Sequence, residues 1–373
     1  MAGWTRFSRR DLLRVGATGA ALAGSAGALS LLAPDAGRAS TAAPEPHPGH
    51  PRATNHEHDG ESHGLSMTIG EVGADAIGID PTAYLTTFDY GTVSTLPNGQ
   101  TLREYDIIAF DREIEIAPGV FFPAWTYNGQ VPGPTIRCNE GDRLRLHFTN
   151  AGTHPHTIHY HGIHSAFMDG VTGIGRGQIE VGEIFTYEFD AAPYGCHLYH
   201  CHSQPLKRHI HKGLYGAFII NPDPAKHGAL ARERHPDHME SEKWQEFVMM
   251  MNAFDTTFDG ENEVYAINSI AFEYMRHPIR VERDRPVRIY LINVTEFDPI
   301  NSFHLHANFF NYYDHGTTLE PTLRTVDTIM QCQAQRGILE MSFAGFEPGQ
   351  YMFHAHQTEF VELGWMSVFE VVE

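Results

Sequence analysis

The sequence has little positive charge for its length. Its 373 residues include 26 Lys and Arg against 46 Asp and Glu, which gives a formal net charge of -20. A surface with this balance repels the phosphates of nucleic acids, so we expect no nucleic-acid partner. Long hydrophobic runs are also missing, because the apolar stretch at 15–32 is interrupted by glycines and is weak for a spanning helix. We therefore expect no membrane anchor.

Cysteine is scarce too, with four residues against 25 histidines. No CxxC pair occurs, which excludes zinc ribbons and dithiol redox motifs, and no spacing identifies a disulfide. A single cysteine is usually an inert, buried small residue. Cys201 differs from the other three because histidines flank it on both sides. The four positions are Cys138, Cys196, Cys201 and Cys332.

Segments with a helical period are absent from the body of the chain. From about residue 76 it consists of short apolar runs separated by Gly, Pro, Asn and Asp, for example 106–110, 143–148 and 184–189. Such runs predict β-strands, and the lack of any long segment with a helical period favours β-sandwiches.

The N-terminus has the pattern of a twin-arginine export signal. Arg9 and Arg10 precede the Ala, Gly and Leu-rich stretch at 15–32. We expect residues 1–43 to be a cleaved signal peptide and the mature protein to be periplasmic or extracellular. Residues 44–75 are rich in His and Pro and lack apolar periodicity, so they predict a flexible arm. A solvated linker is favoured there over a copper-capturing segment.

An internal repeat divides the remaining chain. Residues 136–146 resemble residues 279–289, and each copy is followed closely by one His-x-His and much later by a second. A polar linker begins near residue 222, which predicts a first domain at 76–222 and a second at 223–373. The pairs are His159/His161 and His200/His202 in the first half, and His304/His306 and His354/His356 in the second.

These four pairs predict a metal cluster. Alternate residues of a strand share a face, so each His-x-His presents two imidazoles side by side. Neutral imidazole suits copper, zinc and iron. One pair arises by chance, but four at matched places do not, and eight imidazoles are too many for a mononuclear site.

Cys201 indicates a second kind of site. On a strand it points away from the face that His200 and His202 share, so its sulfur serves a different metal. A Cys-His₂ set with a weak axial position is the blue-copper electron-transfer arrangement. His156, three residues before His159, is the first candidate imidazole.

The other imidazole of this set comes from His209 or His211. Leu214 follows five residues after His209, whereas Gly216 follows five residues after His211 and offers no axial side chain. We therefore favour His209.

Three segments resemble multicopper oxidases and copper nitrite reductases, namely residues 125–136, 156–162 and 200–216. The resemblance implies an all-β chain of two tandem cupredoxin domains, which are Greek-key β-sandwiches. It also implies four coppers per chain: one type 1 copper that feeds a trinuclear cluster of one type 2 and two type 3 coppers.

The resemblance assigns the ligands residue by residue. Type 1 copper would be held by His156, Cys201 and His209, with Leu214 where many relatives have an axial Met. Leu cannot coordinate, so we expect a three-coordinate, relatively oxidising site. Type 2 copper would be held by His159 and His304. The type 3 pair would be held by His161, His200, His202, His306, His354 and His356.

The second domain has lost the type 1 set. Asn301 stands at the position of His156 and Ala355 at that of Cys201, while Phe360 and Trp365 occupy the remaining positions. This resembles the two-domain laccase-like group with type 1 copper in the first domain only. That group implies a cyclic homotrimer with the trinuclear cluster between subunits.

The implied reaction takes electrons from a small reducing substrate and passes them to dioxygen, which becomes water. The donor class stays open among phenols, aromatic amines and low-valent metal ions. Asp169, just past the first His pair, is our candidate proton relay. A turn Asp before Gly170 is the equal alternative.

Two other functions compete with this prediction. A copper nitrite reductase needs only three type 2 histidines and carries an Asp at the position of His159, so the surplus imidazoles favour the oxidase. A noncatalytic copper carrier would explain the His-rich arm but not an ordered Cys-His₂ site beside eight further ligands. The copper content separates the three functions: four coppers per chain for the oxidase, two for the nitrite reductase and a variable number for the carrier.

Overall fold

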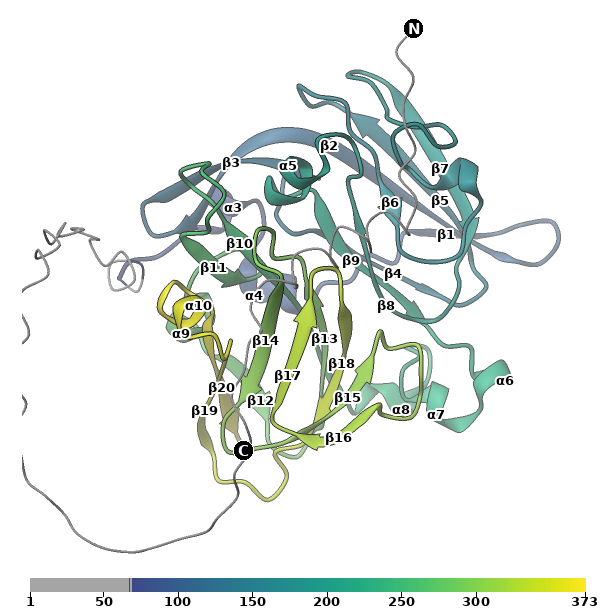
Figure 1. Ribbon diagram of the computed structural model, residues 1–373. Coiled ribbons are helices and arrows are strands. Elements are labelled where there is room, and N and C mark those ends of the chain that lie inside the picture. Colours follow the sequence, from purple (N-terminus) through teal and green to yellow (C-terminus); the bar gives the residue numbers. More distant parts are fainter. Residues whose placement is uncertain (1–66, 68) are drawn as a thin grey trace, which may run out of the picture. The chain divides into compact units, whose positions relative to one another are not determined.

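The computed structural model describes Met67 and residues 69–373 (Figure 1). The predicted signal peptide and most of the predicted arm, up to residue 66 and also residue 68, lie outside the described residues. Within the described part, no helix is both long and apolar enough to cross a membrane. Met67 is 2% exposed and its carbonyl accepts a hydrogen bond from Arg276 at 2.9 Å. This residue of the predicted arm therefore packs against the second domain, ahead of residue 76, where we placed the start of the first domain.

The first half of the chain forms two sheets around one core. Side chains such as Ile107, Leu146 and Phe218 fill the space between the sheets. One sheet has the order β1 (Thr92–Thr95), β2 (Thr101–Ala117), β5 (Arg143–Asn150) and β7 (Ile184–Asp190), with β3 (Val120–Tyr127) paired to β2. The other has the order β4 (Gly133–Asn139), β9 (Tyr215–Asn221), β8 (Gly195–His200) and β6 (His159–Tyr160).

The second half repeats this plan, and its core includes Phe303, Leu339 and Phe353. The two sandwiches confirm the predicted all-β fold of two tandem cupredoxin domains. One sheet has the order β11 (Val264–Ile267), β10 (Gln245–Phe254), β13 (Val287–Asn293), β18 (Arg336–Met341), β15 (Phe310–Asp314) and β16 (Leu323–Val326). The other has the order β12 (Ile279–Glu282), β20 (Met366–Val372), β19 (Gly349–His354), β14 (Ile300–Leu305) and β17 (Thr328–Cys332).

The burial pattern of each strand follows its place. Along β5 buried and half-buried residues alternate, as expected for a strand with one face on the core. All six residues of β8 and the last eight of β10 are buried, because these strands also face the other domain. A separate apolar cluster joins Leu198 of β8 and Ile219 of β9 to Met250 of β10. Met249 to Met251 are therefore structural residues of a buried strand.

Helices are short and connect strands. Asp80 caps α4 by accepting hydrogen bonds from the N–H groups of Thr82 at 2.8 Å and Ala83 at 3.0 Å. Three single-turn helices lie in the segment that we predicted as a polar linker. The helices are α3 (Ala74–Ile77), α4 (Pro81–Thr86), η1 (Ala166–Met168), α5 (Leu206–His211), α6 (Pro224–His227), α7 (Ala229–Arg232), α8 (Met239–Glu242), α9 (Glu273–Arg276) and α10 (Thr358–Glu362).

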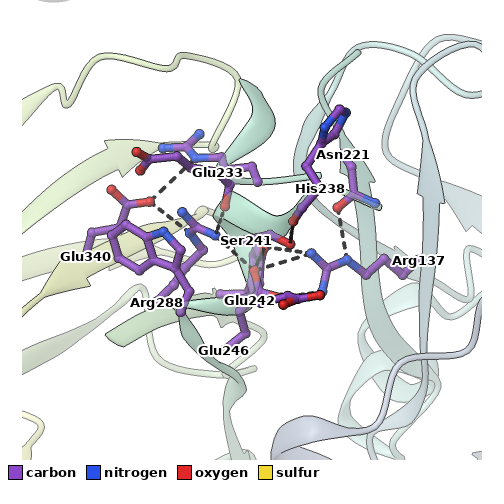
Figure 2. A network of polar contacts seen from close by, with 12 residues as sticks. Arg137, Asn221, Glu233, His238, Ser241, Glu242, Glu246, Arg288 and Glu340 are labelled. Carbon is purple, nitrogen blue, oxygen red and sulfur yellow. Dashed lines mark hydrogen bonds and ion pairs between the residues drawn. The ribbon is translucent and has the colours of Figure 1, made fainter. Parts of the chain in front are cut away.

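A buried ion network fastens the two domains together (Figure 2). Arg137 of β4 reaches across to Glu246 of β10, with Nη1 2.6 Å from Oε2. Arg288 of β13 contacts Glu246 at 3.1 Å and Glu340 of β18 at 2.8 Å. Burial opposes ionisation of Glu246, but the charges of Arg137 and Arg288 outweigh it and lower its pKa to about 2.

Replacing Glu246 with glutamine should therefore destabilise the protein by about 3–5 kcal/mol, because the buried guanidinium of Arg137 loses its counter-charge and that of Arg288 keeps only Glu340. The folded-state pKa of Glu246 lies below its ordinary value of 4.5. Its stabilisation is thus present above pH 4.5 and is lost as pH falls towards 2, and the variant should lack this component. Urea unfolding across pH measures both effects. The matched variant Glu188→Gln, in a half-exposed ion pair with Arg145, should cost less than about 1 kcal/mol; equal costs would contradict the prediction.

Candidate metal centres

The structure brings His156, Cys201 and His209 together. Cys201 directly follows β8, His156 precedes β6, and His209 lies in α5. The Nδ1 atoms of the two imidazoles are 3.2 Å apart. The Sγ of Cys201 lies 3.2 Å from Nδ1 of His209 and 4.0 Å from Nδ1 of His156. All three side chains are at most 2% exposed, so their donor atoms face one another in a dry site.

The chemistry of this donor set fits copper. Burial is the largest effect and the positive charges near each ring add to it, so the pKa of His156 is lowered to about 3 and that of His209 to about 4. Both imidazoles are therefore neutral. Burial raises the pKa of the Cys201 thiol, although the N–H of Thr157 donates to Sγ at 3.3 Å. A bound cation would reverse this effect and favour the thiolate. Two neutral imidazoles and one thiolate form the trigonal set of a blue-copper site.

The competing imidazole, His211, is turned away from this set. Its Nε2 accepts a hydrogen bond from the N–H of Asp255 at 2.9 Å, and its ring packs edge-on against Phe297. Leu214 is fully buried and its carbonyl accepts the N–H of Cys201 at 3.0 Å, so the residue that we placed at the axial position contributes no ligating atom.

The four histidines of the first domain form a second cluster. His159 of β6 is paired with His200 of β8 in the sheet register. The Nε2 atoms of His161 and His200 lie 3.2 Å apart, and the ring centroid of His159 is 5.5 Å from that of His202. The four rings line a cavity of about 280 Å³ whose other walls include Gln333 from the second domain.

Backbone carbonyls fix the orientation of these rings. His159 Nδ1 is 2.8 Å from the carbonyl oxygen of Asp169, and His200 Nδ1 is 2.9 Å from that of Cys201. A proton on Nδ1 leaves Nε2 as the donor atom that faces the cluster. Burial lowers the pKa of His161 to about 2 and that of His200 to about 3, which keeps both neutral. The Nδ1 atom of His202 is buried without a hydrogen-bond partner, as a metal ligand would be.

The second domain repeats the same arrangement. His304 of β14 pairs with His354 of β19, and His306 Nε2 lies 2.8 Å from His354 Nε2. His304 Nδ1 is 3.1 Å from the carbonyl oxygen of Asp327, the counterpart of the contact between His159 and Asp169. The ring of His356 lies 5.3 Å from that of His304. This second four-histidine cluster is more open, because His306 and His356 are exposed.

The counterpart of the Cys-His₂ site is filled in the second domain. The indole N–H of Trp365 donates to Oδ1 of Asn301 at 3.1 Å, and the Asn301 amide donates to Thr295 at 3.0 Å. Ala355 and Phe360 are buried beside them. These polar groups satisfy one another and no sulfur is present, so the residues that replaced the ligands form an ordinary packed core.

The two four-histidine clusters remain separate. Within the described part of the chain, no group of close ligand atoms combines histidines of both clusters. Asp169 lies beside the first cluster, with Oδ1 3.2 Å from Nδ1 of His159. It also precedes Gly170, whose φ of 68° and close approach to the Ile158 carbonyl require glycine. The structure is thus compatible with both the relay and the turn interpretation of Asp169.

Several residues around these sites were not predicted. Trp125 stacks obliquely on His209 at 4.7 Å between ring centroids. Arg336 of β18 reaches His161, with Nη1 3.4 Å from Nδ1. Thr157 and Ser302 hold the backbone N–H groups of His202 and His356 with their hydroxyl groups. Of these residues, only Thr157 and Ser302 could have been recognised from the sequence, because they occupy the same position in the two copies of the repeat.

Fold and sites together define a two-domain cupredoxin metalloprotein with one Cys-His₂ set and two four-imidazole clusters. Two family models, both described as multicopper oxidase, match residues 111–225 and 237–373. A multicopper oxidase crystal structure is 55% identical, covers 81% of this chain and 100% of its own, and has a TM-score of 0.74. The chain belongs to the multicopper oxidase family, whose members are copper-dependent oxidoreductases that use dioxygen.

Two curated relatives illustrate the range of the similarity. Laccase-2 of Botryotinia fuckeliana is 37% identical over 139 residues, which cover 36% of this chain and 23% of that protein. A probable nitrite reductase-hydroxylamine oxidoreductase fusion protein of Kuenenia stuttgartiensis is 29% identical over 285 residues, covering 70% of this chain and 30% of that protein. The matched segments thus span less than a third of the length of these relatives.

Proposed function

We propose that this protein is a laccase-like multicopper oxidase, which couples one-electron oxidation of a small donor to the four-electron reduction of dioxygen to water. The observation that supports this most directly is the division of residues 200–202 between two sites. Cys201 Sγ faces His156 and His209, while the rings of His200 and His202 lie with His159. One peptide bond joins Cys201 to His200 and another joins it to His202. A short bonded path would therefore connect the Cys-His₂ site, where electrons enter, to the four-histidine cluster, where dioxygen is reduced.

We propose four coppers per chain, as the resemblance to multicopper oxidases implies. His156, Cys201 and His209 would hold type 1 copper, and His159 and His304 would hold type 2. The type 3 pair would be held by His161, His200, His202, His306, His354 and His356. The separation of the two four-histidine clusters within one chain supports a homotrimer in which a cluster forms between the first domain of one subunit and the second domain of the next.

The chain's own residues then have defined tasks. Bound copper supplies the one-electron redox chemistry and the reduction of dioxygen. Complete burial of Cys201 and His156 excludes water from the Cys-His₂ site, and Trp125 and Leu214 close it. The carbonyls of Asp169 and Cys201 hold two imidazoles with Nε2 directed at the cluster. We further propose export by the twin-arginine route and keep the domain limits of 76–222 and 223–373.

Copper-containing nitrite reductase is the second candidate, because several relatives are named as nitrite reductases. His159 argues against it, since that family carries an Asp at this position. The two complete His pairs of the second domain are also more than its type 2 site needs.

Metal analysis of the purified, copper-loaded protein tests the proposal. We expect four coppers per chain and oxygen consumption with an uncharged dimethoxyphenol as donor. Two coppers per chain, together with nitrite reduction and no oxygen uptake, would identify the nitrite enzyme. Variable loading without turnover would identify a carrier.

Asp169 provides a further prediction about proton delivery. Asp169→Asn keeps the backbone carbonyl that holds His159 and suits the turn before Gly170, but it removes a group that can carry a proton. We expect kcat to fall about a hundredfold with unchanged copper content and a larger solvent isotope effect. Asp327→Asn is the matched control, because Asp327 holds His304 through its carbonyl in the same way. Unchanged kcat in Asp169→Asn would leave the turn as its only role.

A further inference from the structure

Lys212 is a buried cation beside the Cys-His₂ site. It directly follows α5, the helix that carries His209, and is only 7% exposed. Its Nζ atom lies 5.1 Å from the ring centroid of Phe122, 5.2 Å from that of Phe258 and 5.7 Å from that of Trp125. Phe258 belongs to the β10–β11 loop of the second domain, and in Figure 1 this loop lies close to α5 and β3. Both domains therefore contribute to this aromatic cage.

No carboxylate neutralises the ammonium group in the cage. Within the described part of the chain, Lys212 forms no ion pair. Asp111 stands opposite Trp125 in the register of β2 and β3, but it is exposed and beyond ion-pair distance. Burial and the charge of Arg208 lower the pKa of Lys212 to about 8, so the group is still largely protonated at pH 7. A buried ammonium without a counter-charge costs stability, so packing alone does not account for a lysine here.

One aromatic ring separates this charge from the donor atoms of the Cys-His₂ site. The ring of Trp125 packs on the ring of His209 at 4.7 Å and on that of His156 at 5.2 Å between centroids. The ammonium of Lys212 therefore lies within roughly 10 Å of the His209 ring. Trp125 is 5% exposed, so little water screens the charge along this path.

We propose that Lys212 raises the reduction potential of copper at the Cys-His₂ site and thereby widens the range of donors that the protein can oxidise. A nearby positive charge disfavours Cu(II), the more positive state, relative to Cu(I). At roughly 10 Å and the effective dielectric constant of a protein interior, one charge shifts this equilibrium about tenfold. The inference rests on the proposed oxidase function, because it requires copper held by His156, Cys201 and His209.

The rest of the molecule gives such a charge its value. A net charge of -20 favours Cu(II) and lowers the potential, which Lys212 opposes locally. A pocket of about 540 Å³ lies beside α5, with Phe258 and Phe297 in its walls. Its lining combines two cations of α5 with two carboxylates of the β10–β11 loop, so charge does not select a donor there. The potential of the copper then decides which donors are oxidised.

Lys212→Met tests the proposal, because methionine is a flexible apolar side chain that can fill the cage without a charge. We expect redox titration of the blue absorption to give a potential about 59 mV lower, which is a tenfold change in a one-electron equilibrium. The free energy of unfolding of the copper-free protein should stay the same or rise, since a buried unpaired charge is removed. A lysine with only a structural role would give the reverse, with lower stability and an unchanged potential. Lys212→Arg keeps the charge and should keep the potential.

Lys207→Met is the matched control, because it removes an exposed cation of the same helix. Water and salt screen that charge, so the potential should change less than half as much as in Lys212→Met, and not at all in 1 M salt. The effect of Lys212→Met should persist in 1 M salt. Equal shifts in the two variants, or an unchanged potential in a Lys212→Met protein that is blue and consumes oxygen, overturn the inference and keep the oxidase. Absence of blue absorption in the unaltered copper-loaded protein would instead reject the proposed type 1 site.

Discussion

Cys201→Ser is expected to abolish the blue absorption of the copper-loaded protein and to lower donor-driven oxygen consumption by more than about a hundredfold. The serine hydroxyl is nearly the same size and can still accept the N–H of Thr157, so the fold should persist. A hydroxyl is not readily deprotonated and is a harder ligand than a thiolate, so it does not form the blue-copper set with His156 and His209. Three coppers per chain should remain, because the eight imidazoles of the two four-histidine clusters are untouched.

The control for this variant is Cys332→Ser, which removes an exposed cysteine of β17. It should keep the blue colour, the full copper content and the activity. Absorption spectra, metal analysis and oxygen electrode rates on both variants complete the comparison. A blue Cys201→Ser protein, or one that retains most of its activity, would show that electrons enter elsewhere.

The four His-x-His pairs were predictable because a strand fixes the direction of alternate side chains. In the structure β8 ends at His200, so only one residue of the pair His200/His202 lies on the strand; the rings of His200 and His202 still lie with His159, while Cys201 Sγ faces His209. The repeat then predicted that the second domain would reproduce the first. The structure agrees in detail, since His159 pairs with His200 as His304 pairs with His354.

The choice between His209 and His211 was harder from sequence, because it depended on a short helix that the strand pattern did not predict. Residues two apart on a helix point to nearly opposite sides, so once α5 forms, only one of the pair can face Cys201. The structure places His209 there and turns His211 towards Asp255. Single-turn helices such as α5 to α8 have weak intrinsic stability and form through tertiary packing, which leaves little trace in a local pattern.

The pocket beside α5 and the domain contacts could not be predicted for a related reason. Phe258 and Phe297 come from loops of the second domain, far along the chain from α5, and neither belongs to a motif. Arg336 meets His161 from a separation of 175 residues. A single sequence, taken by itself, does not show which residues far apart in the chain are in contact. Only the packing of β8 and β9 against β10 and β13 reveals these pairs.

Mixing two inactive variants should restore about one quarter of the activity if the trinuclear cluster lies between subunits. His161→Ala breaks the first-domain cluster, and His306→Ala breaks the second-domain cluster, so each variant alone should be inactive. In a random equimolar mixture, half of all first-domain faces and half of all second-domain faces are intact. A working cluster needs one of each, and in a ring with identical heterologous contacts this happens at about one interface in four.

Differently tagged variants, co-expressed and purified through both tags, provide the mixed oligomers for oxygen-uptake measurements. Because this purification removes trimers of a single variant, the purified mixed trimers should show about one third of the activity, whereas the unselected mixture should show about one quarter. Each restored cluster would combine Cys201 and the intact first-domain histidines of the His306→Ala chain with the second-domain histidines of the His161→Ala chain, so electrons can still reach it. Mixing His161→Ala with His202→Ala, two changes in the same cluster, should restore nothing. A mixture of His161→Ala and His306→Ala that also stays inactive, although both tags are present, would place the complete cluster within one chain and exclude the shared site.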